Sequence, residues 1–99
     1  MHFFPLLKFK VYGNSMRPSY KNGEQVLALH FFKNLKINDV VVLKNPHKNV
    51  KEKYIIKRIA KVSKEKYFVL GDNSRESTDS RAFGWIEKKD IAGKVVYSL

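Results

Sequence analysis

Short apolar runs, each ended by turn-forming residues, are the feature that most constrains this fold. From Lys8 onward, Gly, Asn, Asp and Pro separate these runs, a pattern typical of strands and turns rather than long helices. We therefore predict a mainly β fold with little helix, a compact antiparallel sheet or barrel-like core. The predicted strands lie near residues 9–12, 25–31, 39–44, 53–62, 66–71 and 93–97, with a helical turn near 31–36.

Two turn signals set the expected connections. The Asn22-Gly23 pair in "YKNGEQ" is typical of a tight hairpin turn, and we expect it to pair the segment after Ser15 with a returning strand. Pro46 in "LKNPHKNV" is expected to end the strand before it. Neither a repeat nor a linker divides the 99 residues, so we predict one domain over residues 1–99 with a tail at 1–8.

The charge balance favours anionic partners but does not choose among them. Lys and Arg number 20 against 9 Asp and Glu, a net charge of +11, which suits nucleic acid or an anionic membrane surface. No nucleic-acid-binding signature accompanies the scattered lysines, so we expect no nucleic-acid partner and a solvated basic surface. With 0 cysteines, disulfides and thiolate chemistry are excluded. We expect no cofactor and no metal.

The N-terminal segment "MHFFPLLKFK" is a poor signal peptide, and no apolar run reaches the roughly 20 residues of a transmembrane helix. Phe3, Phe4, Leu6 and Leu7 beside Lys8 have the chemistry to enter a bilayer interface. A first strand or a core-covering tail explains them equally well. We therefore expect a monomer that is either peripheral to a membrane or cytoplasmic.

One lysine falls on an apolar face of a predicted strand. In "YIIKRIA", the two-residue period places Ile55, Lys57 and Ile59 on one face. Burial would lower the pKa of Lys57 and make it a candidate general base. An edge strand on which Lys57 extends its ammonium into water is the alternative, and this segment by itself favours it.

A serine nucleophile is the second candidate. In "GNSMRPSY", Gly13 allows close approach and Pro18 fixes the exit of the chain around Ser15, although Gly-Asn-Ser is more often a simple turn. The polar segment "LGDNSRESTDSRAFG" offers an ion pair between Asp79 and Arg81 and hydroxyl groups that can orient an amine. Each segment is weak evidence, so the hypothesis rests on the three together.

Together the three segments resemble the conserved boxes of the bacterial signal peptidase I family of serine endopeptidases. "GNSMRPSY" resembles the nucleophile box, with its Ser-Met-x-Pro core at Ser15, Met16 and Pro18, and implies that Met16 and Pro18 contact the substrate. "YIIKRIA" resembles the box of the general base and maps that role onto Lys57. "GDNSRESTDSRAFG" resembles the third box, and "INDVVVLKNP" is similar to a strand between the first two. The resemblance covers about residues 11–97.

The resemblance implies a serine–lysine dyad of Ser15 and Lys57 on the family's β core. It implies that Ser77 hydrogen-bonds to Lys57 and orients it. It also implies that Asp79 and Arg81 form an ion pair that supports the site.

Four further residues are implied as supports. Gly13 and Asn14 precede the nucleophile, and Gly13 stands where some members have a serine, so we expect backbone N–H groups to hold the oxyanion. Asp72 and Asn73 belong to the Gly-Asp-Asn of the third box.

The implied function is removal of N-terminal signal or pro-sequences from precursor proteins or peptides. We expect no N-terminal membrane anchor of the kind found in typical members, and a similar anchorless branch, proposed to mature nickel-type superoxide dismutase, is one alternative. A self-cleaving repressor-type protease fits less well, because it needs a partner domain. A non-catalytic basic β module that binds nucleic acid or membrane is a further alternative, but it would need neither Ser15 nor Lys57.

Overall fold

The computed structural model describes residues 5–31 and 34–99. Strands make up 43% of the described chain and helical turns 11%, as the short apolar runs predict. The elements in order are β1 (Leu6–Lys10), β2 (Gln25–Leu29), β3 (Val40–Lys44), β4 (Tyr54–Ser63), β5 (Lys66–Leu70), η1 (Ser74–Glu76), α1 (Ser80–Phe83), β6 (Ile86–Glu87), η2 (Lys88–Asp90) and β7 (Ile91–Ser98).

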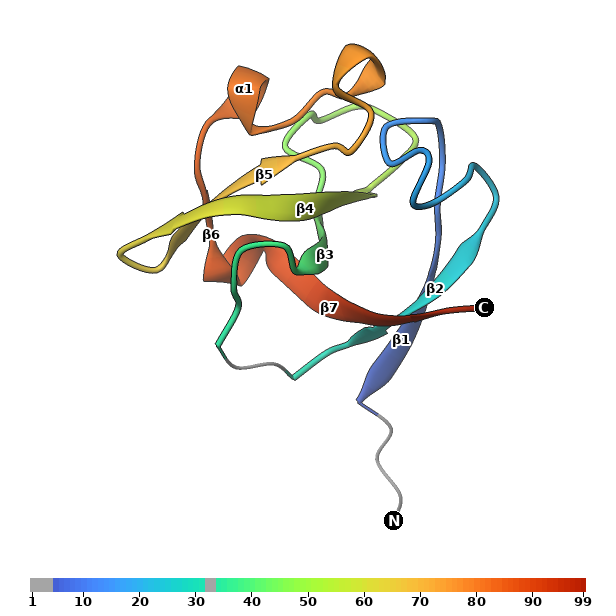
Figure 1. Cartoon of the computed structure of the whole chain (residues 1–99), viewed down its shortest axis with the longest axis horizontal. Coiled ribbons are helices and arrows are strands. Elements are labelled where there is room, and N and C mark those ends of the chain that lie inside the picture. The colour runs from blue at the N-terminus through green and yellow to red at the C-terminus, as the bar shows by residue number, and fades with distance from the viewer. Residues whose placement is uncertain (1–4, 32–33) are drawn as a thin grey trace.

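All seven strands of the described chain join one antiparallel sheet in the order β1-β2-β7-β3-β4-β5-β6. The sheet curves without closing into a barrel, so the antiparallel prediction is confirmed in its open form. The last strand, β7, lies between β2 and β3 and connects the N-terminal hairpin to the rest of the sheet (Figure 1). No helix in the two described segments is long and apolar enough to cross a membrane.

Strand β3 is covered on both faces, which gives the fold two hydrophobic clusters. Val41 and Leu43 belong to one cluster, and Val40 and Val42 to the other. This follows from strand geometry, because successive side chains point to opposite faces. The first cluster is Leu35, Val41, Leu43, Ile59, Tyr67, Val69, Ile86 and Ile91. The second is Val11, Met16, Val26, Ala28, Val40, Val42 and Ile56.

The connection between β1 and β2 differs from the predicted hairpin. Strand β2 pairs with β1, which precedes Ser15, and the segment after Ser15 is not a strand. The Asn-Gly turn is present, with Gly23 at φ +89° and the N–H of Glu24 donating to the Lys21 carbonyl. The N–H of Val11 donates to the Glu24 carbonyl, so the strand pair closes beneath a loop that carries Ser15. The prediction failed because a turn signal does not say which segment returns.

The other strand predictions are confirmed, with small differences at the ends. Residues 6–8, expected in the tail, are part of β1, and the two-residue strand β6 was not predicted. Pro46 follows the end of β3, as expected. The predicted helical turn is absent at residues 34–36. Residues 32–33, and Phe3 and Phe4 of the predicted membrane-contacting tail, lie outside the described residues.

Replacement of Val42 by Ala tests the double-sided packing of β3. Val42 is 0% exposed, so we expect Val42→Ala to lower the free energy of unfolding by about 2 kcal/mol or more, through lost burial and the cavity left behind. Val62→Ala is the matched control, because Val62 on β4 is 41% exposed. Urea unfolding monitored by tryptophan fluorescence would measure both changes, and equal losses would contradict this packing.

Candidate active site

Lys57 is a buried basic residue in the middle of the sheet. Its residue is 4% exposed, and Ile59 on the same face is 0% exposed. Strand β4 lies between β3 and β5, with Lys57 opposite Val41 of β3. The predicted alternation is therefore present, and the alternative of an edge-strand lysine in water is wrong.

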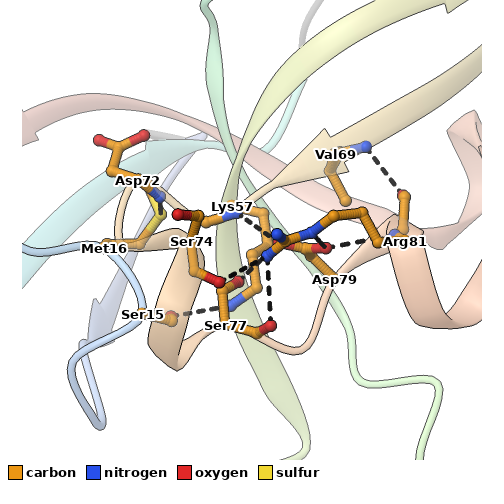
Figure 2. Close-up of polar contacts among 11 residues, drawn as sticks. Ser15, Met16, Lys57, Val69, Asp72, Ser74, Ser77, Asp79 and Arg81 are labelled. Carbon is orange, nitrogen blue, oxygen red and sulfur yellow. Dashed lines mark hydrogen bonds and ion pairs between the residues drawn. The ribbon is translucent and has the colours of Figure 1, made fainter.

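The loop between β1 and β2 brings Ser15 to this lysine. Nζ of Lys57 donates a hydrogen bond of 2.8 Å to Oγ of Ser15 (Figure 2). Ser15 is half-buried and lies in a turn, where the N–H of Arg17 donates to the Asn14 carbonyl. Gly13 has φ +81°, and its N–H donates to Oδ1 of Asn22 across the loop. The serine is thus both a turn residue and the partner of a buried amine.

The pKa of Lys57 is lowered from its ordinary value, chiefly because burial disfavours the charged ammonium. The negative charge of Asp79 acts in the opposite direction and raises this pKa. The lowering by burial is the larger effect. Beside the Ser15 hydroxyl, Lys57 is therefore more readily neutral than a lysine in water.

Asp79 is the centre of the hydrogen bonds in the segment after β5. It is 1% exposed, and its carboxylate accepts from the N–H of Gly71 at 2.9 Å, from Oγ of Ser77 at 2.7 Å and from Nε of Arg81 at 2.9 Å. It also caps α1 by accepting from the backbone N–H of Arg81. Burial tends to raise the pKa of Asp79, but the hydrogen bonds from Arg81, Gly71 and Ser77 outweigh burial and leave it well below its usual range.

Ser77, expected to orient Lys57, makes its hydroxyl hydrogen bond with Asp79. The Ser77 hydroxyl donates to Asp79, and Arg81 binds the Asp79 carboxylate and the Ser74 carbonyl (Figure 2). The ion pair anticipated from the sequence is therefore present. An orienting role of Ser77 toward Lys57 stays a prediction.

Direct contacts join the serine loop to the segment after β5. The N–H of Asn73 donates to the Ser15 carbonyl at 2.8 Å, and Nδ2 of Asn73 donates to the Asn14 carbonyl at 3.1 Å. The N–H of Asp72 points to the sulfur of Met16 at 3.5 Å. These bonds fix the position of Ser15 from a segment more than fifty residues away in the chain.

Gly71 lies at the closest point of this junction. A Cβ atom at this position would lie 2.1 Å from Oγ of Ser77 and 2.6 Å from the carbonyl oxygen of Ser15. Only a residue without a side chain allows both loops to approach the backbone here. The sequence analysis did not select Gly71, although its place before Asp-Asn was a usable signal.

Arg58 is the other residue that the sequence analysis missed. It neighbours Lys57 in sequence and so points to the opposite face of β4. Its guanidinium binds both carboxylate oxygens of Asp72 at 2.9 Å and the Asn38 carbonyl at 2.9 Å. The hydrogen bonds from Arg58 lower the pKa of Asp72. The Lys-Arg pair therefore anchors two neighbouring segments from opposite faces of one strand.

A cavity of about 40 Å³ opens beside the Ser15–Lys57 pair. Ser15, Met16 and Lys57 line it together with Tyr12 and Tyr54. Met16 is only 1% exposed and belongs mainly to the second hydrophobic cluster. Pro18 is exposed and does not line this cavity. Substrate contacts of Met16 and Pro18 stay predictions.

The described residues hold no group of three or more His, Cys, Asp or Glu side chains that could bind a metal ion. Within this part of the chain, the amine of Lys57 lies at hydrogen-bond distance from Ser15, and the buried carboxylate of Asp79 accepts from the Ser77 hydroxyl and the Gly71 N–H. Such groups can move a proton between a hydroxyl and an amine.

Comparison with known proteins gives consistent matches. A family model described as "Signal peptidase, peptidase S26" matches residues 1–61 and 60–99. Signal peptidase I V of Bacillus subtilis (strain 168) is 29% identical over an alignment of 139 residues. That alignment includes 90% of this chain and 83% of that protein. Signal peptidase I of Buchnera aphidicola subsp. Baizongia pistaciae (strain Bp) and Signal peptidase IB of Staphylococcus aureus (strain Mu50 / ATCC 700699) are each 56% identical over 36 residues, or 36% of this chain. These two matches span only 12% and 19% of the respective proteins.

Acid unfolding tests the hydrogen bonds around Asp79. An unfolded aspartate titrates near pH 3.9, whereas the pKa of Asp79 in the fold is lower. The stabilisation from this carboxylate is therefore fully present above about pH 5 and is lost progressively as pH falls through the unfolded and then the folded pKa. We expect the free energy of unfolding to decrease between about pH 5 and pH 2, and to decrease less steeply in Asp79→Asn.

Urea unfolding at several pH values would measure these slopes. Glu65→Gln, at an exposed turn position, is the control for loss of one carboxylate and is expected to keep the wild-type slope. An Asp79→Asn slope equal to that of the wild type would contradict the assignment.

Proposed function

Because this chain belongs to the signal peptidase, peptidase S26, family, we propose that it is a serine endopeptidase in which Ser15 is the nucleophile and Lys57 the general base. The observation that carries this proposal is the 2.8 Å contact between Oγ of Ser15 and Nζ of a lysine that is 4% exposed. A hydroxyl nucleophile needs a base within hydrogen-bond reach. A surface lysine would stay protonated and could not serve as that base.

The reaction begins when neutral Lys57 accepts the hydroxyl proton of Ser15. Oγ then forms a bond to the carbonyl carbon of the substrate, and the carbonyl oxygen gains the negative charge. The Lys57 ammonium returns the proton to the leaving amine as the peptide bond breaks. A water molecule, deprotonated in turn by Lys57, attacks the acyl-enzyme and releases Ser15.

Backbone N–H groups near Ser15 are the proposed donors to the oxyanion. Within the described residues, the hydrogen bonds of this loop use the N–H groups of Gly13 and Arg17 but not those of Ser15 and Met16. A free N–H at the nucleophile is suited to a developing oxyanion, because it needs no rearrangement during the reaction.

The segment after β5 acts as the proposed positioning element. Asn73 holds the Ser15 carbonyl, while the Asp79–Arg81 pair fixes Ser77 against Gly71. The charge of Asp79 also keeps the pKa of Lys57 from falling further. These contacts limit the movement of the two reacting side chains. Holding reacting groups in position is a general source of enzymatic rate enhancement.

The proposed substrate is a precursor protein or peptide with small residues before the cut, from which an N-terminal signal or pro-sequence is removed. Strand β1 is at the end of the described sheet, so an extended peptide can add to its free edge through backbone hydrogen bonds. Small residues suit the 40 Å³ cavity beside Ser15.

Cleavage of a fluorogenic peptide with an Ala-x-Ala junction tests the dyad. We expect Ser15→Ala and Lys57→Met each to lower kcat/KM at least about a thousandfold, because each removes one member of the reacting pair. Ser63→Ala and Lys61→Met, which change exposed residues of the same strand β4, are matched controls expected to keep activity. Substantial cleavage by folded Ser15→Ala would contradict the proposal.

The pH dependence of kcat/KM tests the protonation state of Lys57. Activity is expected to rise with pH as Lys57 loses its proton, with a midpoint below the ordinary lysine pKa of about 10.4. Asp79→Asn removes the charge that raises this pKa, so its midpoint is expected at lower pH than that of the wild type. Glu65→Gln is expected to leave the midpoint in place, and an unchanged midpoint in folded Asp79→Asn would contradict the assignment.

A further inference from the structure

A wide groove continues from the small cavity at Ser15 along the surface. The groove has a volume of about 410 Å³ and shares Lys10, Tyr12, Glu52 and Tyr54 with the cavity. One wall is the end of β1, and the other is the beginning of β4 with the residues before it. A peptide held at Ser15 therefore has a direct path into this groove.

The charge of the groove is strongly positive. Lys8 and Lys10 lie on one wall, Lys51 and Lys53 on the other, and Glu52 is the one acidic residue among those that line it. All four lysines are exposed. A cleft lined by one sign of charge concentrates ligands of the opposite sign.

The floor of the groove is aromatic. The rings of Phe9 and Tyr54 pack with centroids 5.4 Å apart, and Nζ of Lys10 lies 6.0 Å from the centroid of the Tyr12 ring. Tyr12 and Tyr54 are 59% and 44% exposed. These rings offer apolar contact for the stem of a long side chain, while the lysines surround its end.

We propose that this groove selects substrates with glutamate or aspartate residues near the scissile bond, a preference that rests on the proposed function of the Ser15–Lys57 pair. The carboxylates would bind Lys8, Lys10, Lys51 and Lys53, and the methylene groups of a glutamate would lie on Tyr12 and Tyr54. Lysine residues at the same substrate positions would be repelled. The net charge of the whole chain, +11, adds a longer-range attraction for an acidic precursor.

Peptides with a fixed Ala-x-Ala junction test this preference. Two glutamates are placed either before or after the junction, and each peptide has a matched version with glutamines. At low salt we expect kcat/KM to be about three to ten times higher for the glutamate peptide on the side that enters the groove, the range expected for two exposed charge interactions. The preference should decrease in about 0.5 M salt because the lysines are exposed.

A pair of double variants distinguishes the effect of the groove lysines on the preference from the effect of the net charge of the chain. Lys8→Gln with Lys51→Gln removes two groove lysines and is expected to reduce the preference to less than twofold. Lys64→Gln with Lys66→Gln removes the same charge from residues that do not line the groove and is expected to keep the preference. An equal effect of both double variants would assign the preference to net charge and overturn the inference.

The remaining outcomes separate the two proposals. Equal cleavage of glutamate and glutamine peptides overturns the acidic preference and leaves the peptidase proposal standing. If the wild type cleaves no peptide, fluorescence anisotropy with Ser15→Ala decides. Binding of a glutamate peptide that is tighter than binding of its glutamine counterpart, and that is lost with Lys8→Gln and Lys51→Gln, then supports the groove without the activity. Equal binding of the two peptides overturns the groove as well. Loss of binding to phosphatidylglycerol vesicles in that double variant, with the peptide preference unchanged, assigns the groove to lipid and overturns the inference.

Discussion

An ammonium group that is almost fully buried must either lose its proton or find polar partners, because removal of a charge from water is costly. Lys57 has both options in this fold. Its Nζ contacts the Ser15 hydroxyl, and the buried carboxylate of Asp79 acts on it electrostatically. Most of the polar contacts described above hold these partners in place. The sheet buries the amine of Lys57, and the loops supply its polar partners.

Strand β4 distributes this arrangement over its two faces. Lys57 points toward the serine loop, whereas Arg58 points the other way and binds Asp72. Asp72 and the adjacent Asn73 then contact Met16 and Ser15 through backbone N–H groups. Two neighbouring basic residues of one strand thus anchor both segments that meet at the site. A shift of β4 by one residue would exchange the two faces and disconnect both anchors.

The parts of this structure that follow from local pattern could be predicted from the sequence. The face of Lys57 is set by a two-residue period, and most strand positions are set by apolar runs between turn residues. What could not be predicted depends on distances between remote segments. The return of β2 to β1 beneath the serine loop, the bond from Ser77 to Asp79 and the pairing of Arg58 with Asp72 each require coordinates. Strand β6 has two residues, too few to show a period.

The position of β7 has a consequence for how the two reacting side chains are held together. Strand β7 is the last of the described strands, yet it lies between β2 and β3, and so it joins the hairpin whose loop carries Ser15 to the strands that carry Lys57. Among the described strands, the β1–β2 hairpin pairs with the rest of the sheet through β7 alone. The hydrogen bond between Ser15 and Lys57 therefore depends on a strand that follows both residues in the sequence.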